Sequence, residues 1–277
     1  DKAACRKMAK NAGVPVVPGS EGLVTSPEEA VQLAEGIGYP ILVKASAGGG
    51  GKGMRIAHND ASLIHALSVA SNEAELAFGD GGVYLEKFVE NARYVEVQII
   101  ADHHGHVVHL GERECSIQRR HQKLLEESPS TGLTNSLRTK MTKAAVKLAK
   151  SIQYTNAGTV EFILTPDGKF YFIELNARLQ VEHPVTEEVT GIDLVREQIR
   201  VAAGEPLGYS SVKPQGASIE ARIYAENPDK NFMGCPGVIK HCHFPGGPGI
   251  RVDTHIFSGY EVPRYYDSMI AKVIARG

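Results

Sequence analysis

The segment formed by residues 170–184 constrains this chain most, because its polarity alternates. From residue 173 to residue 182 the odd positions are apolar, whereas the even positions are Glu174, Asn176, Arg178, Gln180 and Glu182. Successive side chains of an extended strand point to opposite faces, so an extended chain here would place five polar groups in one row. Such a row can hold a metal ion and an anion side by side. A strand with one face in water shows the same alternation, so the pattern alone leaves both interpretations open.

The residues before this segment predict a β-hairpin. Residues 158–164 are strand-like, and residues 165–169 have the Thr-Pro-Asp-Gly-Lys composition of a turn. In that hairpin Glu161 faces Glu174, and like charges placed directly opposite each other destabilise a sheet. A divalent cation between the two carboxylates reverses the sign of this interaction. Magnesium is the natural candidate, because proteins hold it with one or two carboxylates and substrate phosphates.

Composition excludes several classes of function. The 277 residues carry a net charge of −2. The chain therefore lacks the excess of basic residues that would indicate binding to nucleic acid or to an anionic membrane. No apolar run is long enough to span a bilayer and no signal peptide is visible, so we expect a soluble, cytoplasmic protein. The four cysteines form no Cys-x-x-Cys pair, so we expect free thiols. Residues 102–106, although rich in histidine, are expected to form an exposed hairpin tip rather than a metal site.

Periodicity and capping signals predict mixed α+β structure with a largely antiparallel sheet. Ser26, Pro27 and Glu29 form a helix start with an N-cap, an N1 proline and an acid at the capping-box position. The expected helices span residues 2–11, 27–36, 60–77, 136–152 and 192–203. The expected strands span residues 39–46, 54–57, 83–89, 93–101 and 107–114, with the 158–176 hairpin and a β-rich end after them.

A glycine-rich loop, residues 46–53, lies between two strand-like segments. A dinucleotide-binding loop opens a helix, and a Walker A loop places Ser or Thr after its lysine, whereas Gly53 follows Lys52 here. What remains is a flap between strands, whose backbone N–H groups can close on phosphates. A flexible surface hairpin is the alternative.

Residues 119–123 are locally basic, as a solvated loop or a phosphate or bicarbonate site would be.

These motifs together resemble the biotin carboxylase family, the ATP-grasp enzymes or domains of biotin-dependent carboxylases. The resemblance rests on the flap and on residues 112–123, 174–187, 219–222 and 265–270. It implies an ATP-grasp domain over residues 1–210, with a mobile glycine-rich lid at about 17–88. It also implies a β-rich C-terminal domain over 211–277. By this resemblance the family's N-terminal domain is absent and its C-terminal domain is cut short.

The resemblance further implies an activity. Biotin on a biotin carboxyl carrier protein is carboxylated with bicarbonate and ATP through carboxyphosphate, the first half-reaction of an enzyme such as acetyl-CoA carboxylase in fatty acid synthesis. The implied partners are that carrier, a carboxyltransferase component and further copies of the same chain. Two alternatives stay open from the sequence. One is another ATP-grasp ligase that joins a carboxylate to an amine, and the other is an inactive nucleotide-binding fragment.

The residue roles also follow from the resemblance. It implies that ATP is bound by Lys2, Lys44, Gly48, Gly49, Gly50, Gly51, Lys52, Gly53, Glu86, Lys87, Val89, Gln118, His121, Glu161 and Glu174. Magnesium or manganese would be held by Glu161, Glu174 and Asn176. Bicarbonate and biotin would be bound by Lys123, Arg178, Gln180, Val181 and Arg222. The implied catalytic residues are Arg178, Lys123, Glu182 as the base for bicarbonate, and Arg222 as the group that stabilises the biotin enolate.

Overall fold

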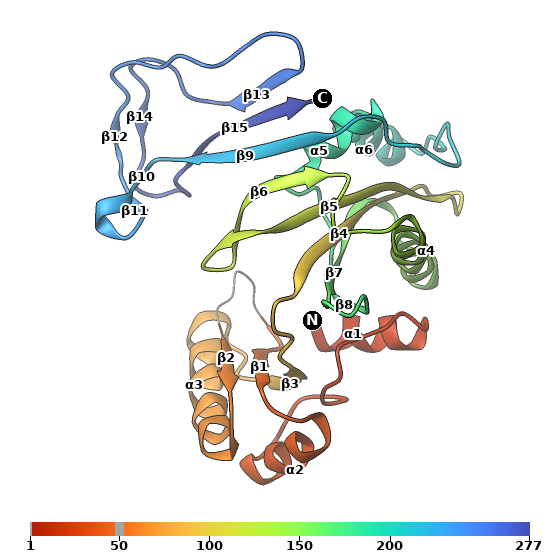
Figure 1. Cartoon of the computed structure of the whole chain (residues 1–277), viewed down its shortest axis with the longest axis vertical. Helices are drawn as coiled ribbons and strands as arrows, with labels where there is room; N and C mark the ends of the chain where they lie inside the picture. Colours follow the sequence, from red (N-terminus) through yellow and green to blue (C-terminus); the bar gives the residue numbers. More distant parts are fainter. Residues whose placement is uncertain (1, 48–52) are drawn as a thin grey trace.

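The structure is a computed structural model that describes residues 2–47 and 53–277, without the side chain of Lys2. Figure 1 shows a small lobe with helices α2 and α3, joined to a larger part built on one long sheet. The helices are α1 (Lys2–Asn11), α2 (Pro27–Ile37), α3 (Asp60–Phe78), α4 (Asn135–Ser151), α5 (His183–Thr190), α6 (Leu194–Ala202) and the short 3₁₀ helix η1 (Pro228–Lys230). The strands are β1 (Ile41–Ala45), β2 (Met54–Ala57), β3 (Val83–Lys87), β4 (Arg93–Ala101), β5 (Val107–Arg119), β6 (Gln122–Ser128), β7 (Asn156–Leu164), β8 (Phe170–Asn176), β9 (Ser218–Tyr224), β10 (Glu226–Asn227), β11 (Met233–Gly234), β12 (Gly237–Val238), β13 (Ile250–Thr254), β14 (Glu261–Val262) and β15 (Met269–Arg276).

The long sheet has eight strands in the order β13-β15-β9-β6-β5-β4-β7-β8, so strands from the C-terminal region extend the sheet formed by the middle of the chain. All ladders between the described strands are antiparallel. Val97 of β4 packs in a core with α1 and α4, whereas Ile100 packs in a second core with α6. Side chains alternate between faces along a strand, so helices cover both faces of this sheet. The predicted α+β class with a largely antiparallel sheet is confirmed.

The small lobe contains the sheet β2-β1-β3, with α2 and α3 packed around a separate apolar core. Its helices begin where capping predicts, because the Ser26 hydroxyl accepts a hydrogen bond from the Glu29 backbone N–H. Asn59 and Ser62 cap the start of α3 reciprocally. β1 and β2 form the antiparallel pair predicted on either side of the glycine-rich loop, and the Ala45 N–H donates to the Gly53 carbonyl. Residues 48–52 of the predicted flap lie outside the described residues.

The predicted β7–β8 hairpin is confirmed, and Glu161 pairs directly with Glu174 across it. The extended row predicted for residues 173–182 is only partly correct. β8 ends at Asn176, and after a short loop α5 begins at His183, a helix that the alternation concealed. Pro184 is at the second position of that helix, where its missing N–H costs nothing. The remaining predicted helices agree with the structure to within two residues at each end.

A second difference concerns the strands around residues 119–123, because β5 is longer than predicted and β6 was not predicted. Residues 119–123 form the tip of the β5–β6 hairpin, where residues 120–122 are exposed and Lys123 lines the cavity described below. β5 continues to Arg119, and Arg120 and His121 occupy a two-residue turn with φ of 52° and 64°. The other hairpin tip, at residues 102–106, is confirmed. There the buried Asp102 carboxylate accepts hydrogen bonds from the backbone N–H groups of His104 and His106. Among the described helices, none is both long enough and apolar enough to cross a bilayer.

Candidate active site

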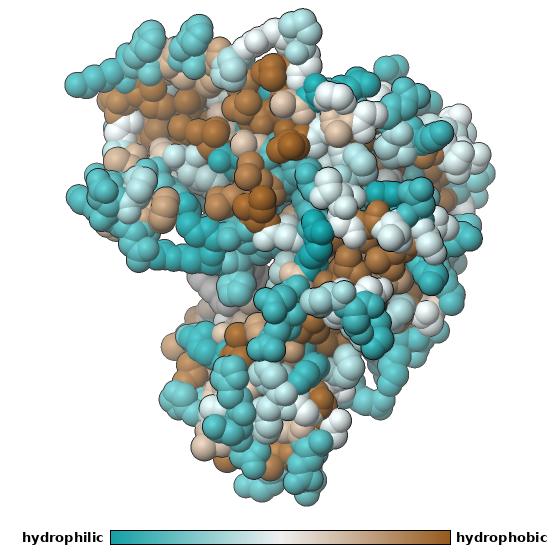
Figure 2. Space-filling model, in the orientation of Figure 1, coloured by the Kyte–Doolittle hydropathy of each residue, from teal (hydrophilic) through white to brown (hydrophobic). Residues whose placement is uncertain are grey.

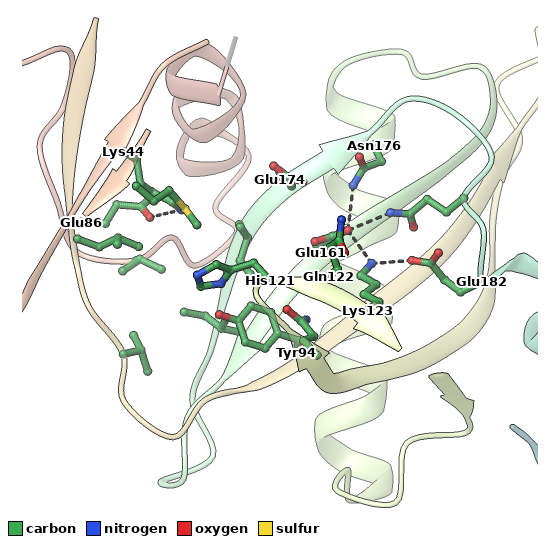
Figure 3. Close-up of a pocket in the computed structure, with 18 of the residues that line it drawn as sticks. Lys44, Glu86, Tyr94, His121, Gln122, Lys123, Glu161, Glu174, Asn176 and Glu182 are labelled. Atoms are coloured by element: carbon green, nitrogen blue, oxygen red, sulfur yellow. Dashed lines mark hydrogen bonds and ion pairs between the residues drawn. The ribbon is translucent and has the colours of Figure 1, made fainter. Parts of the chain in front are cut away.

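A cavity of about 760 Å³ lies between the small lobe and the long sheet. The surface is indented between these two parts (Figure 2). Figure 3 shows Lys44 and Glu86 on one side of the cavity, and Glu161, Lys123 and Glu182 on the other. The predicted site residues that line it are Lys44, Glu86, Lys87, Val89, Gln118, His121, Lys123, Glu161, Glu174, Asn176, Arg178, Gln180, Val181, Glu182 and Arg222.

One predicted residue does not line the cavity, and the others lie outside the described part of the structure. Gly53 is absent from the cavity wall, and its φ of +71° together with a Cβ position 2.8 Å from the Ala45 Cβ explains the glycine by backbone geometry instead. Gly48, Gly49, Gly50, Gly51 and Lys52 lie outside the described residues. The side chain of Lys2 also lies outside them.

The Lys123 ammonium group is the centre of the site. It donates to Glu96 at 2.5 Å, to Glu182 at 2.6 Å and to Glu161 at 3.0 Å. Burial opposes the charged form of Lys123, but Glu96 and Glu161 outweigh burial and raise its pKa, so the lysine stays protonated. Lys123 can reach all three carboxylates because it stands at the start of β6, directly after the tight β5–β6 turn.

Arg113 and Glu96 complete this charge network, and the sequence analysis assigned no role to either. The fully buried Arg113 guanidinium donates to Glu96 at 2.6 Å, to the Gln98 side chain at 2.6 Å and to Gln180 at 3.2 Å. It also bonds the hydroxyls of Thr159 and Thr186. The available signal was the placement of Glu96 and Gln98 at alternate positions of an otherwise apolar strand.

Glu182 accepts hydrogen bonds from two cations, with Lys123 at 2.6 Å on one oxygen and Arg222 at 2.9 Å on the other. Burial alone would raise its pKa, but the charges of Lys123, Arg113 and Arg222 outweigh burial and lower the pKa to about 2. Glu182 is therefore ionised throughout the physiological range. It is a hydrogen-bond acceptor fixed at the edge of the cavity.

β9 carries its polar side chains inward. Glu220 is fully buried, whereas Ile219 and Ile223 on the opposite face are 50% and 40% exposed. Arg222, which lines the cavity, donates to Glu126 at 2.7 Å. Glu220 lies opposite Glu126 in the β6–β9 register. Neither oxygen of Glu220 has a hydrogen-bond partner in the described part of the chain. Burial raises the pKa of Glu126 to about 7 and that of Glu220 to about 8, so the two acids do not both ionise at neutral pH.

On the small lobe Lys44 and Glu86 form a buried ion pair at 2.7 Å. Arg6 lies 3.4 Å from the other oxygen of Glu86. Among the described residues Lys44 has one carboxylate partner, so its ammonium group retains further donors for an anion in the cavity. Lys87 is held differently, because its ammonium group donates to the carbonyls of Gly38 and Tyr39.

The paired acids Glu161 and Glu174 fit a divalent cation. Glu161 accepts hydrogen bonds on Oε1 from Lys123, Asn176 and Gln180, each at 3.0 Å. Burial raises the pKa of Glu161 despite the opposing effect of Lys123. Since the Asn176 amide nitrogen points to Glu161, its carbonyl oxygen remains as a possible ligand. Two facing carboxylates and an amide oxygen form a donor set of the kind that magnesium takes.

Arg178 is the exposed cation of the cavity wall. Its guanidinium donates to the Leu179 carbonyl at 3.2 Å, and it pairs with no carboxylate among the described residues. Gln180, buried against Arg113 and Glu161, follows two residues later in the same loop. A free guanidinium beside ordered amides can bind a small planar anion through parallel hydrogen bonds.

Comparison with known proteins agrees with this geometry. The family model described as the carbamoyl-phosphate synthase L chain, ATP binding domain, matches residues 1–210, and the biotin carboxylase C-terminal domain matches residues 220–277. The whole chain is 54% identical to a biotin carboxylase of Nostoc sp. and 52% identical to a pyruvate carboxylase subunit of Methanothermobacter thermautotrophicus. It spans 62% and 57% of their lengths.

Solved structures show the same relationship. The biotin carboxylase domain dimer of Hydrogenobacter thermophilus 2-oxoglutarate carboxylase, in complex with MgADP, ADP and bicarbonate, superposes with a TM-score of 0.97 at 52% identity. That alignment covers all of this chain and 62% of the other. An ATP-grasp sheet, a cavity lined by paired acids and cations, and matches along the whole chain lead to one conclusion: the chain belongs to the biotin carboxylase family of ATP-grasp proteins.

Proposed function

We propose that the protein containing this chain is a ligase that carboxylates biotin on a carrier protein, using bicarbonate and ATP. The observation that carries this proposal is the arrangement around Lys123. The Lys123 ammonium group donates both to Glu161, which belongs to the Glu161–Glu174 pair, and to Glu182, which Arg222 also contacts. A site for a metal–nucleotide complex therefore adjoins a site for a second anion. The residues 1–210 would form the ATP-grasp domain, with residues 211–277 belonging to the C-terminal domain.

Magnesium or manganese would be held by Glu161 and Glu174, with Asn176 beside them. Bound there, the ion would offset the negative charge of the nucleotide phosphates, including the charge on the attacking and leaving oxygens during phosphoryl transfer. Lys44, at the opposite wall, would contact the same phosphates. Adenine would lie against Lys87 and Val89, where the small lobe joins the sheet, with His121 and Gln118 nearby. The glycine-rich flap would close over the phosphates.

Bicarbonate would bind at Arg178, Gln180, the Val181 backbone and Lys123. It is a poor electrophile, so the proposed route activates it with ATP as carboxyphosphate. The attacking bicarbonate oxygen would displace ADP from the γ-phosphorus of ATP, while Glu182 accepts the bicarbonate proton. Glu182 is ionised and held in place by two cations, and because the same cations lower its basicity, its proposed role depends on position rather than on a pKa near neutrality. Lys123 and Arg178 would stabilise the negative charge that develops as the two anions meet.

Arg222 would act in the second stage, when biotin attacks the activated carbon. Loss of the proton from N1′ places negative charge on the ureido oxygen of biotin, and a guanidinium nearby stabilises that oxyanion. Arg222 lines the cavity and donates to Glu182, so a small shift of its guanidinium would bring it to biotin. Cleavage of the C–O bond of carboxyphosphate would release CO₂ and phosphate, the phosphate would take the N1′ proton, and N1′ would then add to the carbon of CO₂.

The residues of this site do not determine which acyl acceptor finally receives the carboxyl group. The matched relatives include carboxylases named for pyruvate and for 2-oxoglutarate as well as proteins named only biotin carboxylase. We propose acetyl-CoA carboxylase, and hence fatty acid synthesis in the cytoplasm, as the context of this chain. The proposed partners are a biotin carboxyl carrier protein or domain, a carboxyltransferase component and a second copy of the chain. A structural relative crystallised as a dimer supports the last of these.

Bicarbonate-dependent release of ADP, measured with and without free biotin, tests the proposed activity. Glu182→Gln should reduce the bicarbonate-dependent rate by about 100-fold or more, as loss of a general base does, while ADP binding changes little. Arg196→Ala, on the exposed face of α6 and outside the cavity, serves as a matched control. ADP release that is independent of bicarbonate, or that is equal in Glu182→Gln and the wild type, would refute the proposal. Nucleotide binding without any ADP release would indicate an inactive nucleotide-binding fragment.

A further inference from the structure

A second hollow, of about 400 Å³, lies between α4 and the beginning of β5. Figure 1 shows α4 beside the start of β5, whereas the β5–β6 turn that carries the active-site residues is at the other end of that strand. The ten residue-to-residue steps from His109 to Arg119 would extend over about 33 Å, so the two cavities are separate. The hollow is lined by Val107, Val108, His109, Lys143, Val146, Lys147, Lys150, Ser210 and Ser211.

The charge of this region differs from that of the whole protein. Residues 128–160 include five basic residues and no aspartate or glutamate, in a chain with a net charge of −2. Arg138 is paired with Glu112, but the lysines in the hollow do not ion-pair or hydrogen-bond with any of the described residues. The helical spacing of Lys143, Lys147 and Lys150 puts all three on one face of α4.

Three like charges at this spacing repel one another and destabilise the helix, so a bound anion would convert a repulsive arrangement into a stabilising one. The floor and walls add apolar surface, since Val108 is buried and Val146 is half-buried. His109 is half-buried among them, and burial lowers its pKa, which keeps the imidazole neutral. Its Nδ1 accepts a hydrogen bond from the Gly111 N–H, which leaves Nε2 and the two serine hydroxyls as uncharged hydrogen-bonding groups.

We propose that this hollow binds a phosphate-bearing organic anion, with the phosphate held by Lys143, Lys147 and Lys150 and the apolar part of the ligand against Val107, Val108 and Val146. The volume is within the range of small-molecule sites, about 300–1,000 Å³. A concave shape with an apolar floor favours a small ligand over the flat contact of a protein partner. The site goes beyond the proposed carboxylation and does not depend on it.

Calorimetric titration with phenyl phosphate tests the site, in the presence of saturating MgADP to occupy the active-site cavity. The variant Lys143→Gln/Lys147→Gln/Lys150→Gln should bind phenyl phosphate at least about 10-fold more weakly than the wild type, because charge-assisted hydrogen bonds are lost. Lys140→Gln is the matched control, because Lys140 is exposed on the same helix but does not line the hollow. It should change the affinity less than about 2-fold, as expected for a surface charge outside the site.

Further titrations distinguish the contribution of the phosphate group from that of the apolar part of the ligand. Inorganic phosphate should bind more weakly than phenyl phosphate, because it leaves the apolar surface uncovered. The same comparison without nucleotide should show the same dependence on the three lysines. Equal affinity of the triple variant and the wild type would overturn the proposal, and so would an equal loss in Lys140→Gln, which would indicate a diffuse positive field. Tighter binding of a polyglutamate peptide than of phenyl phosphate, lost with the same lysines, would assign the surface to an acidic protein partner instead.

Discussion

Glu220 offers the sharpest test of the electrostatics beneath the active site. Its carboxyl group is fully buried, its oxygens have no hydrogen-bond partner among the residues that the structure describes, and it lies across the β6–β9 pairing from Glu126. A buried acid in this position remains protonated in the folded protein at pH values where it ionises in the unfolded chain. We therefore expect Glu220→Gln, which mimics the protonated form, to change the pH dependence of stability.

The magnitude follows from the pKa of Glu220, which burial raises from 4.5 to about 8, with Lys272 partly offsetting burial. At 1.36 kcal/mol for each pKa unit, the difference of about 3.5 corresponds to about 5 kcal/mol. Proton sharing with Glu126 reduces this value, so we expect about 2–5 kcal/mol. Because the folded-state pKa is raised, the contribution of Glu220 to stability is fully present below pH 4.5. It is lost as the pH rises toward 8.

Urea unfolding at several pH values from 4.5 to 9 measures this effect. The unpaired amide of the glutamine variant costs about 1–3 kcal/mol, but this cost is the same at each pH. The free energy of unfolding of Glu220→Gln relative to wild type should therefore increase by about 2–5 kcal/mol between pH 4.5 and pH 8. Two stability curves that run parallel over this range would refute the assignment of a protonated Glu220.

Three further changes test other parts of the structure. Arg113→Met removes one of the two cations paired with Glu96 and also the donor to the buried Gln98 and Gln180 oxygens, so we expect a loss of about 3–5 kcal/mol in urea unfolding; a loss below about 1 kcal/mol would contradict the place of Arg113 in the buried charge network. Arg178→Ala should leave the melting temperature unchanged, because the side chain is exposed, yet lower bicarbonate-dependent ADP release about 100-fold; an equal fall in MgADP affinity would contradict a role confined to bicarbonate. Gly53→Ala should cost about 1–3 kcal/mol in the same unfolding assay, because of its positive φ and the Ala45 Cβ only 2.8 Å away; wild-type stability would show that the turn relaxes freely.

The sequence predicted the features that depend on local patterns. Capping residues located the start of α2, and turn composition located the β7–β8 hairpin with Glu161 opposite Glu174. It did not locate α5, because alternating polarity and a proline after His183 are equally typical of an extended segment. β6 was missed because its turn uses Arg120 and His121 with positive φ, where glycine or asparagine is the usual signal.

The residues of the site were easier to predict than their partners. Family motifs identified Lys123, Glu182 and Arg222, and all three meet at the cavity. Arg113 and Glu96 escaped notice because a buried ion pair between neighbouring strands depends on register, which composition does not reveal. The inward orientation of Glu220 was hidden for a related reason, since the alternation in β9 does not say which face is buried.

We propose that Glu161 and Glu174 hold a metal–nucleotide complex beside a bicarbonate site at Arg178. Paramagnetic relaxation of ¹³C-labelled bicarbonate by protein-bound Mn²⁺–ADP tests both halves of this claim in one measurement. We expect strong relaxation in the wild type that disappears in Arg178→Ala, where the metal still binds, and in Glu161→Gln/Glu174→Gln, where it does not. Unchanged relaxation in either variant would contradict it.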